Sequence, residues 1–223
     1  MTVRDERKLQ TRQALMTAAL DLLADNRGFA ALSLREVTRA ANVVPTAFYR
    51  HFRDMNELGQ NLVDEAFVTL RRLLRDVRSQ MRQFDSVVRD SVDAYVQHVD
   101  QNRSIFAFVA RERYGGVAEI RAAIAREIRF FVTELADDLA RFKQLNHLGR
   151  PGRELVAQLI VNIVVNLTGD LLDLDQTVPV FHSELREFAV QQIIIVSLGA
   201  VQWRPEINAQ INSVMESASA EKG

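Results

Sequence analysis

The chain has 223 residues, of which 48% are hydrophobic and none is cysteine, and its formal net charge is −1. This length suits one large or two small domains, and the missing cysteines exclude a disulfide framework, a zinc ribbon, an iron–sulfur site and a thiol nucleophile. The low counts of glycine (nine) and proline (four) favour long helices over a turn-rich sheet protein.

The near-neutral total hides two parts of opposite charge. Residues 1–53 contain nine Lys or Arg and five Asp or Glu, a balance of +4, so the remaining residues carry −5. A basic segment of this size before an acidic one predicts a nucleic-acid partner, or another acidic surface, for the first part of the chain. We therefore divide the chain into domains at residues 1–53 and 54–223.

Three helices are predicted in the basic segment. Apolar residues recur with the helical period from Leu15 to Leu23, and Gly28 is expected to end this first helix. Ser33 is suited to be the N-cap of a second, short helix, whose predicted inner face consists of Leu34, Val37 and Ala41.

A tight corner is predicted to lead into the third helix. Asn42 tolerates the left-handed conformation that ends a helix, and Pro45 suits the first helical position because its missing N–H needs no partner there. The spacing of Val44, Phe48 and Phe52 predicts that all three are buried.

The rest of the chain keeps a helical pattern. A capping signal at Asp54–Glu57 starts a fourth helix at about 55–81, and further helices are expected at about 85–100, 103–114, 117–144, 152–174 and 180–203. Residues 206–223 are expected to be frayed. The predicted fold is all-α, with about nine helices and no strand.

Two short helices joined by a tight corner match a helix-turn-helix unit, whose second helix enters the DNA major groove. With Phe48 and Phe52 turned inward, the outer faces of that helix would present side chains suited to base edges and phosphates. These are Thr46, Ala47, Tyr49, Arg50 and His51. The alternative is an ordinary corner of a charged helical bundle, and the charge balance of this segment favours DNA.

The strings Leu32–Val37 (LSLREV) and Pro45–Phe52 (PTAFYRHF) resemble the DNA-binding region of TetR-family bacterial repressors, over about residues 8–60. The resemblance implies a homodimer that binds a palindromic operator. It also implies base recognition by Thr46, Ala47 and Tyr49, and phosphate contacts near Ser33, Arg35, Tyr49 and His51. The full predicted DNA-binding set is Arg12, Ser33, Arg35, Pro45, Thr46, Ala47, Tyr49, Arg50 and His51.

This chain departs from the common family pattern at two points. It has Asn42-Val43-Val44 at the corner where many relatives have Gly-Val-Ser, and Met55 where many have lysine. The first departure removes the usual serine cap of the recognition helix, and the second removes one phosphate contact.

A narrower set of strings resembles the FabR/DesT subgroup, and it extends into the second domain. Besides the helix-turn-helix strings, it includes Glu57–Gly59, Val63–Glu65, Arg111–Arg113, Ala123–Ile128 and Glu134–Asp137. The subgroup also lacks the serine cap and the lysine. The resemblance implies a repressor of unsaturated fatty-acid synthesis or desaturation genes, with a long-chain acyl-CoA as effector.

Two helices of the second domain are too apolar to be covered by one chain alone. A helix that is apolar on all sides needs burial on all sides, so we expect 152–174 and 180–203 to pack against a second copy as a four-helix bundle. The predicted dimer residues are Leu159, Ile163, Leu167, Ile194 and Leu198. The alternative is a purely intrachain core. A polar line formed by Gln158, Asn162, Asn166 and Asp170 would set dimer register, touch a ligand head group or face solvent.

Phenylalanines and arginines cluster in the middle helices. Taken singly they indicate core residues and a solvated face, but with the subgroup resemblance they suggest an apolar tunnel for an acyl chain, with arginines facing the phosphates of coenzyme A. The predicted pocket residues are Phe106, Phe108, Arg111, Arg113, Phe130, Phe131, Asn162 and Asn166. Arg103, Arg121, Arg126 and Arg129 lie nearby in sequence.

No motif calls for an enzyme, a metal or a bound cofactor. The four histidines are scattered, and there is no zinc-protease motif, nucleophile elbow or phosphate-binding glycine loop. The charged start and the polar residues inside 155–174 predict a cytoplasmic, nucleoid-associated protein without a membrane segment. The rivals to an acyl-CoA-responsive repressor are a repressor of an efflux or catabolic operon with another hydrophobic effector, a helical lipid-binding protein without a DNA role, and an undetected enzyme.

Overall fold

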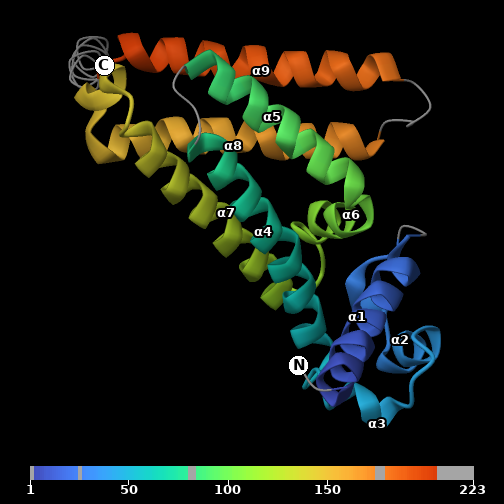
Figure 1. Ribbon diagram of the computed structural model, residues 1–223. Helices are drawn as coiled ribbons and strands as arrows, with labels where there is room; N and C mark the ends of the chain where they lie inside the picture. The colour runs from blue at the N-terminus through green and yellow to red at the C-terminus, as the bar shows by residue number, and fades with distance from the viewer. Residues whose placement is uncertain (1–2, 25–26, 80–83, 174–178, 205–223) are drawn as a thin grey trace, which may run out of the picture.

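The computed structural model describes residues 3–24, 27–79, 84–173 and 179–204. Within these ranges the chain forms nine α-helices and two short 3₁₀ helices, and no strand. The predicted all-helical class is therefore confirmed. The helices form a small head and a larger body (Figure 1).

The head consists of α1 (Val3–Leu23), a 3₁₀ turn (Phe29–Ala31), α2 (Leu34–Ala40) and α3 (Pro45–Phe48). Its core is closed by Leu15, Val37, Phe48 and Phe52, each at most 1% exposed. Close packing of these side chains fixes α2 and α3 against α1, and so fixes the angle at which the head presents its corner.

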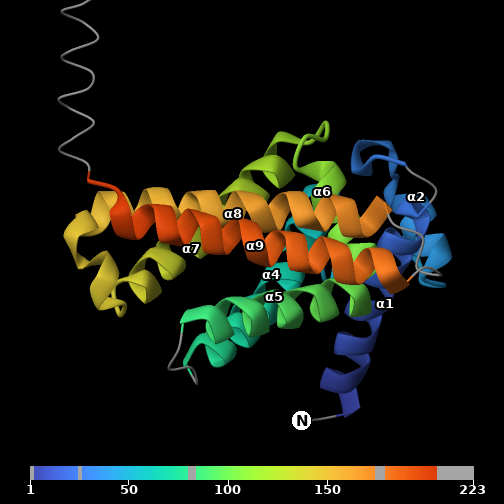
Figure 2. The same cartoon turned by 90° about the horizontal axis from the view of Figure 1, so that it is seen from above.

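The body is built around α4 (Met55–Ser79), which begins at the head and runs into the body (Figure 1). The other body helices are α5 (Phe84–Gln101), α6 (Arg103–Glu112), α7 (Ala118–Leu139), α8 (Gly149–Asp173) and α9 (Pro179–Gln202), with a 3₁₀ helix (Lys143–Leu148) between α7 and α8. The long helices α8 and α9 lie side by side and antiparallel along one side of the body (Figures 1 and 2).

Several boundaries differ from those predicted. The first helix begins at Val3 and ends at Leu23, before Gly28, which instead precedes the 3₁₀ turn. The helix predicted over 117–144 ends at Leu139 and is followed by a 3₁₀ segment. The predicted frayed segment 206–223 lies outside the described residues.

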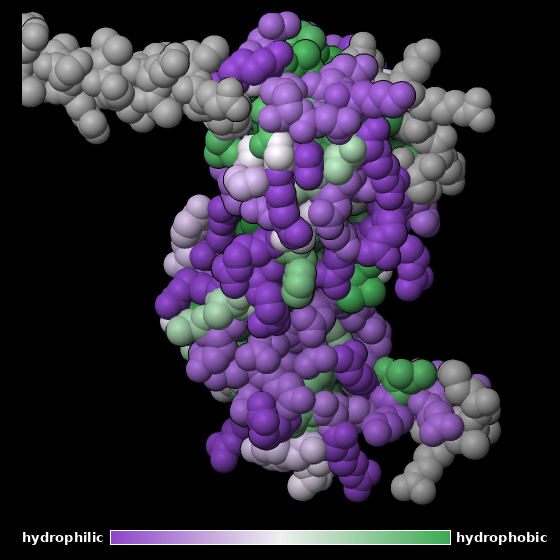
Figure 3. Space-filling model, turned by 90° about the vertical axis from the view of Figure 1, so that its left-hand side faces the viewer, coloured by the Kyte–Doolittle hydropathy of each residue, from purple (hydrophilic) through white to green (hydrophobic). Residues whose placement is uncertain are grey.

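The α7 and α4 side of the molecule is mostly hydrophilic, with small isolated apolar spots from body to head (Figure 3). Ion pairs between α4 and α7 contribute to this polar character: Arg75 Nη2 lies 2.5 Å from Glu134 Oε1, and Arg71 pairs with the buried Glu127. The surface needs no partner to cover it.

Candidate DNA-binding and effector sites

The start of α2 is fixed by a reciprocal cap. The Glu36 amide donates to Ser33 Oγ at 3.3 Å, and the Ser33 amide donates to Glu36 Oε2 at 2.9 Å, which confirms Ser33 as the N-cap. The Ser33 hydroxyl and amide, with Arg27, lower the pKa of Glu36. Because the hydroxyl itself donates to Glu36 at 2.8 Å, a phosphate contact from Ser33 Oγ as donor requires that bond to open.

The corner into α3 turns on Asn42, a non-glycine residue with positive φ (54°), as its sequence position predicted. The α-helical hydrogen bonding of α3 covers only Pro45–Phe48, and the chain continues to Phe52 in turns. Phe48 and Phe52 are buried with their ring centroids 5.5 Å apart. They hold the short helix against the head core.

The outer side of α3 carries exposed side chains in the predicted positions. Thr46, Tyr49 and Arg50 are exposed, and the Tyr49 ring, 64% exposed, packs edge-on against Phe48 at 5.8 Å. The prediction that Val44 is buried is wrong, because it is the N-cap of α3 and is 65% exposed. Its spacing from Phe48 is helical, but the chain at Val44 is extended (ψ 147°), so the side chain turns outward. Val44 thus joins the groups available to a base edge.

One predicted DNA contact, Arg12, is partly engaged within the protein. Arg12 donates to Asn61 Oδ1 on α4 at 2.5 Å, and its guanidinium lies 5.3 Å from the centroid of the Phe52 ring. It therefore joins α1 to α4 as well as adding charge near the corner.

His51 is half-buried, and within the described part of the chain its Nδ1 has no hydrogen-bond partner. Burial lowers the pKa of His51, and the charges of Lys8, Arg12 and Arg50 lower it further. The imidazole is thus neutral near pH 7 and offers a phosphate an N–H rather than a full charge.

Several exposed basic residues of the head lie close in sequence to the corner between α2 and α3. Arg35, Arg39 and Arg50 are exposed on α2 and just after α3, and Lys8 acts electrostatically on His51. A surface of this kind supplies the non-specific, salt-dependent part of DNA binding.

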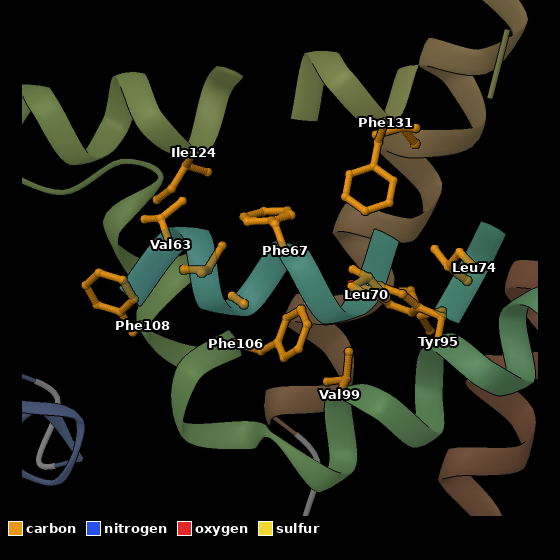
Figure 4. Close-up of a cluster of buried hydrophobic side chains, with 14 of the residues drawn as sticks. Val63, Phe67, Leu70, Leu74, Tyr95, Val99, Phe106, Phe108, Ile124 and Phe131 are labelled. Atoms are coloured by element: carbon orange, nitrogen blue, oxygen red, sulfur yellow. The ribbon is translucent and has the colours of Figure 1, made fainter. Parts of the chain in front are cut away.

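The body contains a cavity of about 1030 Å³ that is lined by residues of α4 to α9 and is open to solvent on part of its surface. Most of its wall is apolar. Phe67 of α4 and Phe131 of α7 pack with ring centroids 5.9 Å apart, and Phe106 of α6 faces Tyr95 of α5 at 6.3 Å (Figure 4). The volume is at the upper end of the ~300–1,000 Å³ range of small-molecule sites.

One polar pair is embedded in this wall. The Tyr95 hydroxyl and Thr168 Oγ1 hydrogen-bond to each other, and Thr168 Oγ1 also donates to the Val164 carbonyl at 2.9 Å. Burial raises the pKa of Tyr95 to about 12, so the phenol remains neutral. The pair satisfies itself and leaves the middle of the cavity suited to an apolar ligand.

Four of the predicted pocket residues line the cavity and four do not. Phe106, Phe131, Arg113 and Asn166 belong to its wall. Phe130 is 52% exposed on the outer side of α7, and Asn162 is exposed on α8. Phe108 and Arg111 face the head, as described below. For the four residues outside the cavity, the helical period predicted the correct helix but not the face on which the side chain lies.

The predicted ring of arginines is largely absent from the cavity. Arg103 donates to the Leu171 and Leu172 carbonyls at 2.9 Å each, and Arg121 donates to the Gly115 carbonyl at 2.5 Å. The cavity wall contains Arg113 and Arg141, of which Arg141 pairs with Asp138 at 3.4 Å. Arg113 stacks over the Tyr114 ring at 5.4 Å, and among the described residues no carboxylate pairs with it.

Helices α8 and α9 leave an apolar surface uncovered. Leu155 and Leu159 on α8 are 48% and 44% exposed, and Ile195 and Leu198 on α9 are 68% and 63% exposed. Among the predicted dimer residues, Leu159 and Leu198 are thus exposed, Ile163 and Ile194 are half-buried, and Ile163 also lines the cavity.

Leu167 is a correction to the predicted dimer set. It is 4% exposed and lines the cavity, so its side chain is unavailable to a partner. The exposed positions on α8 also include Asn162, Asn166 and Asp170, and Asn166 and Asp170 belong to the cavity wall as well, so the predicted polar line runs between solvent and the cavity.

Among the described residues one helical stretch, Lys143–Asp173, is long and apolar enough to cross a membrane by length and composition. Only 33% of its most apolar window is buried within this chain. The stretch contains α8, which packs between α7 and α9, so the open apolar side is the one that a second subunit would cover.

Comparison with known protein families identifies the chain. A family model described as "Tetracyclin repressor-like, C-terminal domain" matches residues 84–196, and one described as "Bacterial regulatory proteins, tetR family" matches residues 15–61. The chain belongs to the TetR family. Members of this family are DNA-binding regulators that respond to small-molecule effectors, typically as dimers.

Solved structures of TetR-family regulators share this fold. A transcriptional regulator from Syntrophomonas wolfei has a TM-score of 0.68 at 15% identity, covering 86% of this chain and 95% of its own. The fatty acid degradation regulator FadR from Bacillus halodurans has a TM-score of 0.58 at 15% identity (81% and 94% covered). NalD from Pseudomonas aeruginosa, the secondary repressor of the MexAB-OprM multidrug efflux pump, scores 0.65 at 21% identity (87% and 97% covered). At these identities the likeness shows the fold and leaves the effector open.

Proposed function

We propose that this TetR-family protein is a homodimeric cytoplasmic repressor of unsaturated fatty-acid synthesis or desaturation genes, whose operator affinity is changed by a long-chain acyl-CoA. The observation that carries the effector assignment is the cavity of about 1030 Å³, which six helices line mainly with apolar side chains and in which the buried Tyr95–Thr168 pair satisfies its own hydrogen bonds. Such a wall favours a long hydrocarbon chain over a polar metabolite.

The head supports specific binding to a DNA duplex. The capped α2 and the buried Phe48 and Phe52 hold α3 with Val44, Thr46 and Tyr49 outward, while exposed arginines supply charge for phosphates. Two recognition helices must lie about 34–36 Å apart to enter successive major grooves, and this requires a dimer. The uncovered apolar surface of α8 and α9 is the side that would form it.

Arg113 supports an effector with an anionic group. It is a half-buried cation in the cavity wall, next to the exposed ring of Tyr114, and it has no carboxylate partner among the described residues. A long-chain acyl-CoA, a thioester that carries phosphates, would bury its hydrocarbon in the cavity and place an anion near Arg113.

The test measures thermal stabilisation by oleoyl-CoA, palmitoyl-CoA, free coenzyme A and a hydrophobic cation such as tetraphenylphosphonium. We expect stabilisation by one or both acyl-CoAs and none by coenzyme A alone, because only the acyl chain fills the cavity. Stabilisation by the cation alone would favour the efflux or catabolic repressor, and no shift with any acyl-CoA would remove the acyl-CoA assignment.

A cavity-filling variant and a matched control locate the ligand. Gly169 lines the cavity, and a Cβ added there meets no atom within 4 Å, so Gly169→Leu is a suitable way to add an isobutyl group at the cavity wall. Thr133→Leu introduces the same side chain at an exposed position of α7. We expect Gly169→Leu to weaken acyl-CoA binding and Thr133→Leu to leave it unchanged; equal behaviour of the two would place the ligand elsewhere.

A further inference from the structure

Helix α6 separates the cavity from the head and has a different face toward each. Phe106, Val109, Ala110 and Arg113 recur at helical spacing and line the cavity. The other face carries Phe108, Arg111 and Glu112, which contact the segment between α1 and α2. Figure 4 shows the same division, with Phe108 beside Val63 at one end of the buried cluster and Leu74 and Tyr95 at the other.

The last turn of α6 is bonded directly to the backbone of the head. Arg111 Nη1 donates to the Leu23 carbonyl at 2.9 Å and to the Arg27 carbonyl at 3.0 Å. The Phe29 amide donates to Glu112 Oε1 at 2.8 Å, and the Glu112 side chain is 1% exposed. Hydrogen bonds to charged groups are stronger than neutral ones, and a buried carboxylate that lost its donor would be left unpaired.

Phe29 fits closely into the surface that α4, α6 and α7 form. Its ring packs edge-on against Phe108 with centroids 5.7 Å apart. A Cβ on Gly59 of α4 would come within 2.4 Å of Ile120 of α7 and 3.0 Å of the Phe29 ring. The junction therefore has little free space, and a displacement of α6 must also displace the head.

We propose that Arg111 and Glu112 are positioning residues whose hydrogen bonds hold the head against α6. We also propose that a ligand in the cavity alters these contacts by binding to the next residue, Arg113. This inference rests on the proposed function, because it assigns the transmission of the effector signal to three consecutive residues. In this route an anion drawn to Arg113 turns the end of α6, and the hydrogen bonds to the Leu23 and Arg27 carbonyls and to the Phe29 amide carry that movement into the head.

The test compares two arginines of α6 that make equivalent bonds at opposite ends of the helix. Arg111→Met removes two bonds to head carbonyls, whereas Arg103→Met removes two bonds of 2.9 Å to carbonyls at the end of α8. Each variant is assayed for operator affinity with and without oleoyl-CoA. Coupling between sites is typically about 5–150-fold.

We expect the oleoyl-CoA effect on operator affinity to fall toward onefold in Arg111→Met and to persist in Arg103→Met, while both variants are still stabilised by oleoyl-CoA. Retained coupling in Arg111→Met would overturn the inference. Hydrogen exchange of the Phe29 amide in the unaltered protein is a second measurement that needs no variant. Its protection should change at least about tenfold on adding oleoyl-CoA, a change of ~1.4 kcal/mol in opening; unchanged protection overturns the inference.

The experiments distinguish a wrong effector assignment from a wrong assignment of the latch, the contacts that Arg111 and Glu112 make with the head. If the unaltered protein is not stabilised by oleoyl-CoA, the acyl-CoA assignment fails, and the latch is judged on the unliganded variants. A head freed from α6 has to be ordered when it binds DNA, so Arg111→Met should weaken operator binding at least about fivefold more than Arg103→Met. Equal affinities of the two variants would overturn the latch.

Discussion

The hydrogen bonds of Tyr95 and Thr168 in the cavity wall predict how substitutions at these two residues change the stability of the protein. Thr168 Oγ1 bonds both the Tyr95 hydroxyl and the Val164 carbonyl, whereas the Tyr95 hydroxyl bonds only Thr168 among the described residues. The two single substitutions are therefore unequal. Tyr95→Phe leaves Thr168 still bonded to the backbone, but Thr168→Val leaves a buried phenol without an acceptor.

The expected free-energy changes follow from that asymmetry. Tyr95→Phe removes one net hydrogen bond and should lower the free energy of unfolding by about 0.5–1.5 kcal/mol. Thr168→Val adds the desolvation of an unpaired hydroxyl, about 1–3 kcal/mol. The double variant removes both polar groups, so it should be less destabilised than the sum of the two, with an interaction energy of about 0.5–3 kcal/mol.

Urea unfolding of the four proteins at one pH measures this cycle, and oleoyl-CoA binding to the same proteins links it to function. The wall of the double variant, which lacks this polar pair, should bind the acyl chain at least as well as the unaltered wall, because the pair satisfies itself and offers no contact to hydrocarbon. Additive single effects, or a larger loss for Tyr95→Phe than for Thr168→Val, would refute the described bonding. Loss of acyl-CoA binding in the folded double variant would refute the apolar role of the wall.

Four further predictions concern the head and the open surface of the body. Phe48→Ala, at a fully buried site, should destabilise the head by about 3–5 kcal/mol and abolish operator binding; near-normal binding would contradict the placement of α3. Arg50→Ala should reduce the slope of log affinity against log salt by about 0.9 if it removes one phosphate contact, and an unchanged slope would exclude that contact. Because the pKa of His51 is lowered in the free protein and DNA phosphates would raise it, binding takes up a proton; operator affinity should rise as the pH falls through the pKa in the complex, and His51→Gln should remove this dependence. Leu198→Glu should convert the dimer to monomer in sedimentation, whereas Val68→Glu, at a 46% exposed position of α4, should not; equal behaviour would place the interface elsewhere.

The sequence predicted the helices well because period and capping are local properties. The Ser33 cap, the left-handed Asn42 and the position of Pro45 at the start of α3 are each determined by a few neighbouring residues. These predictions are confirmed because each depends on interactions between residues that are close in sequence. The chain segment at 140–148 is different, because its 3₁₀ geometry depends on packing against α8 and α9, which no local pattern reports.

The faces of the helices were harder to predict than the helices themselves. Phe108 and Phe106 are two residues apart on one apolar helix, yet one packs against Phe29 of the head and the other lines the cavity. Arg111 looks like a ligand contact in sequence, but its acceptors are carbonyls 84 and 88 residues away. Leu167 likewise is buried and lines the cavity, on a helix that packs against both α7 and α9. Only tertiary packing decides such cases.

The measurement that tests the central claim most directly is selection of bound fragments from the source genome, followed by titration of the recovered operator with oleoyl-CoA. We predict a palindromic site beside genes of fatty-acid unsaturation or desaturation, bound as a dimer, with an affinity that oleoyl-CoA changes by at least about fivefold. Sequence-independent binding that survives Tyr49→Ala and Arg50→Ala would contradict a repressor. A specific operator that no acyl-CoA affects would contradict the effector.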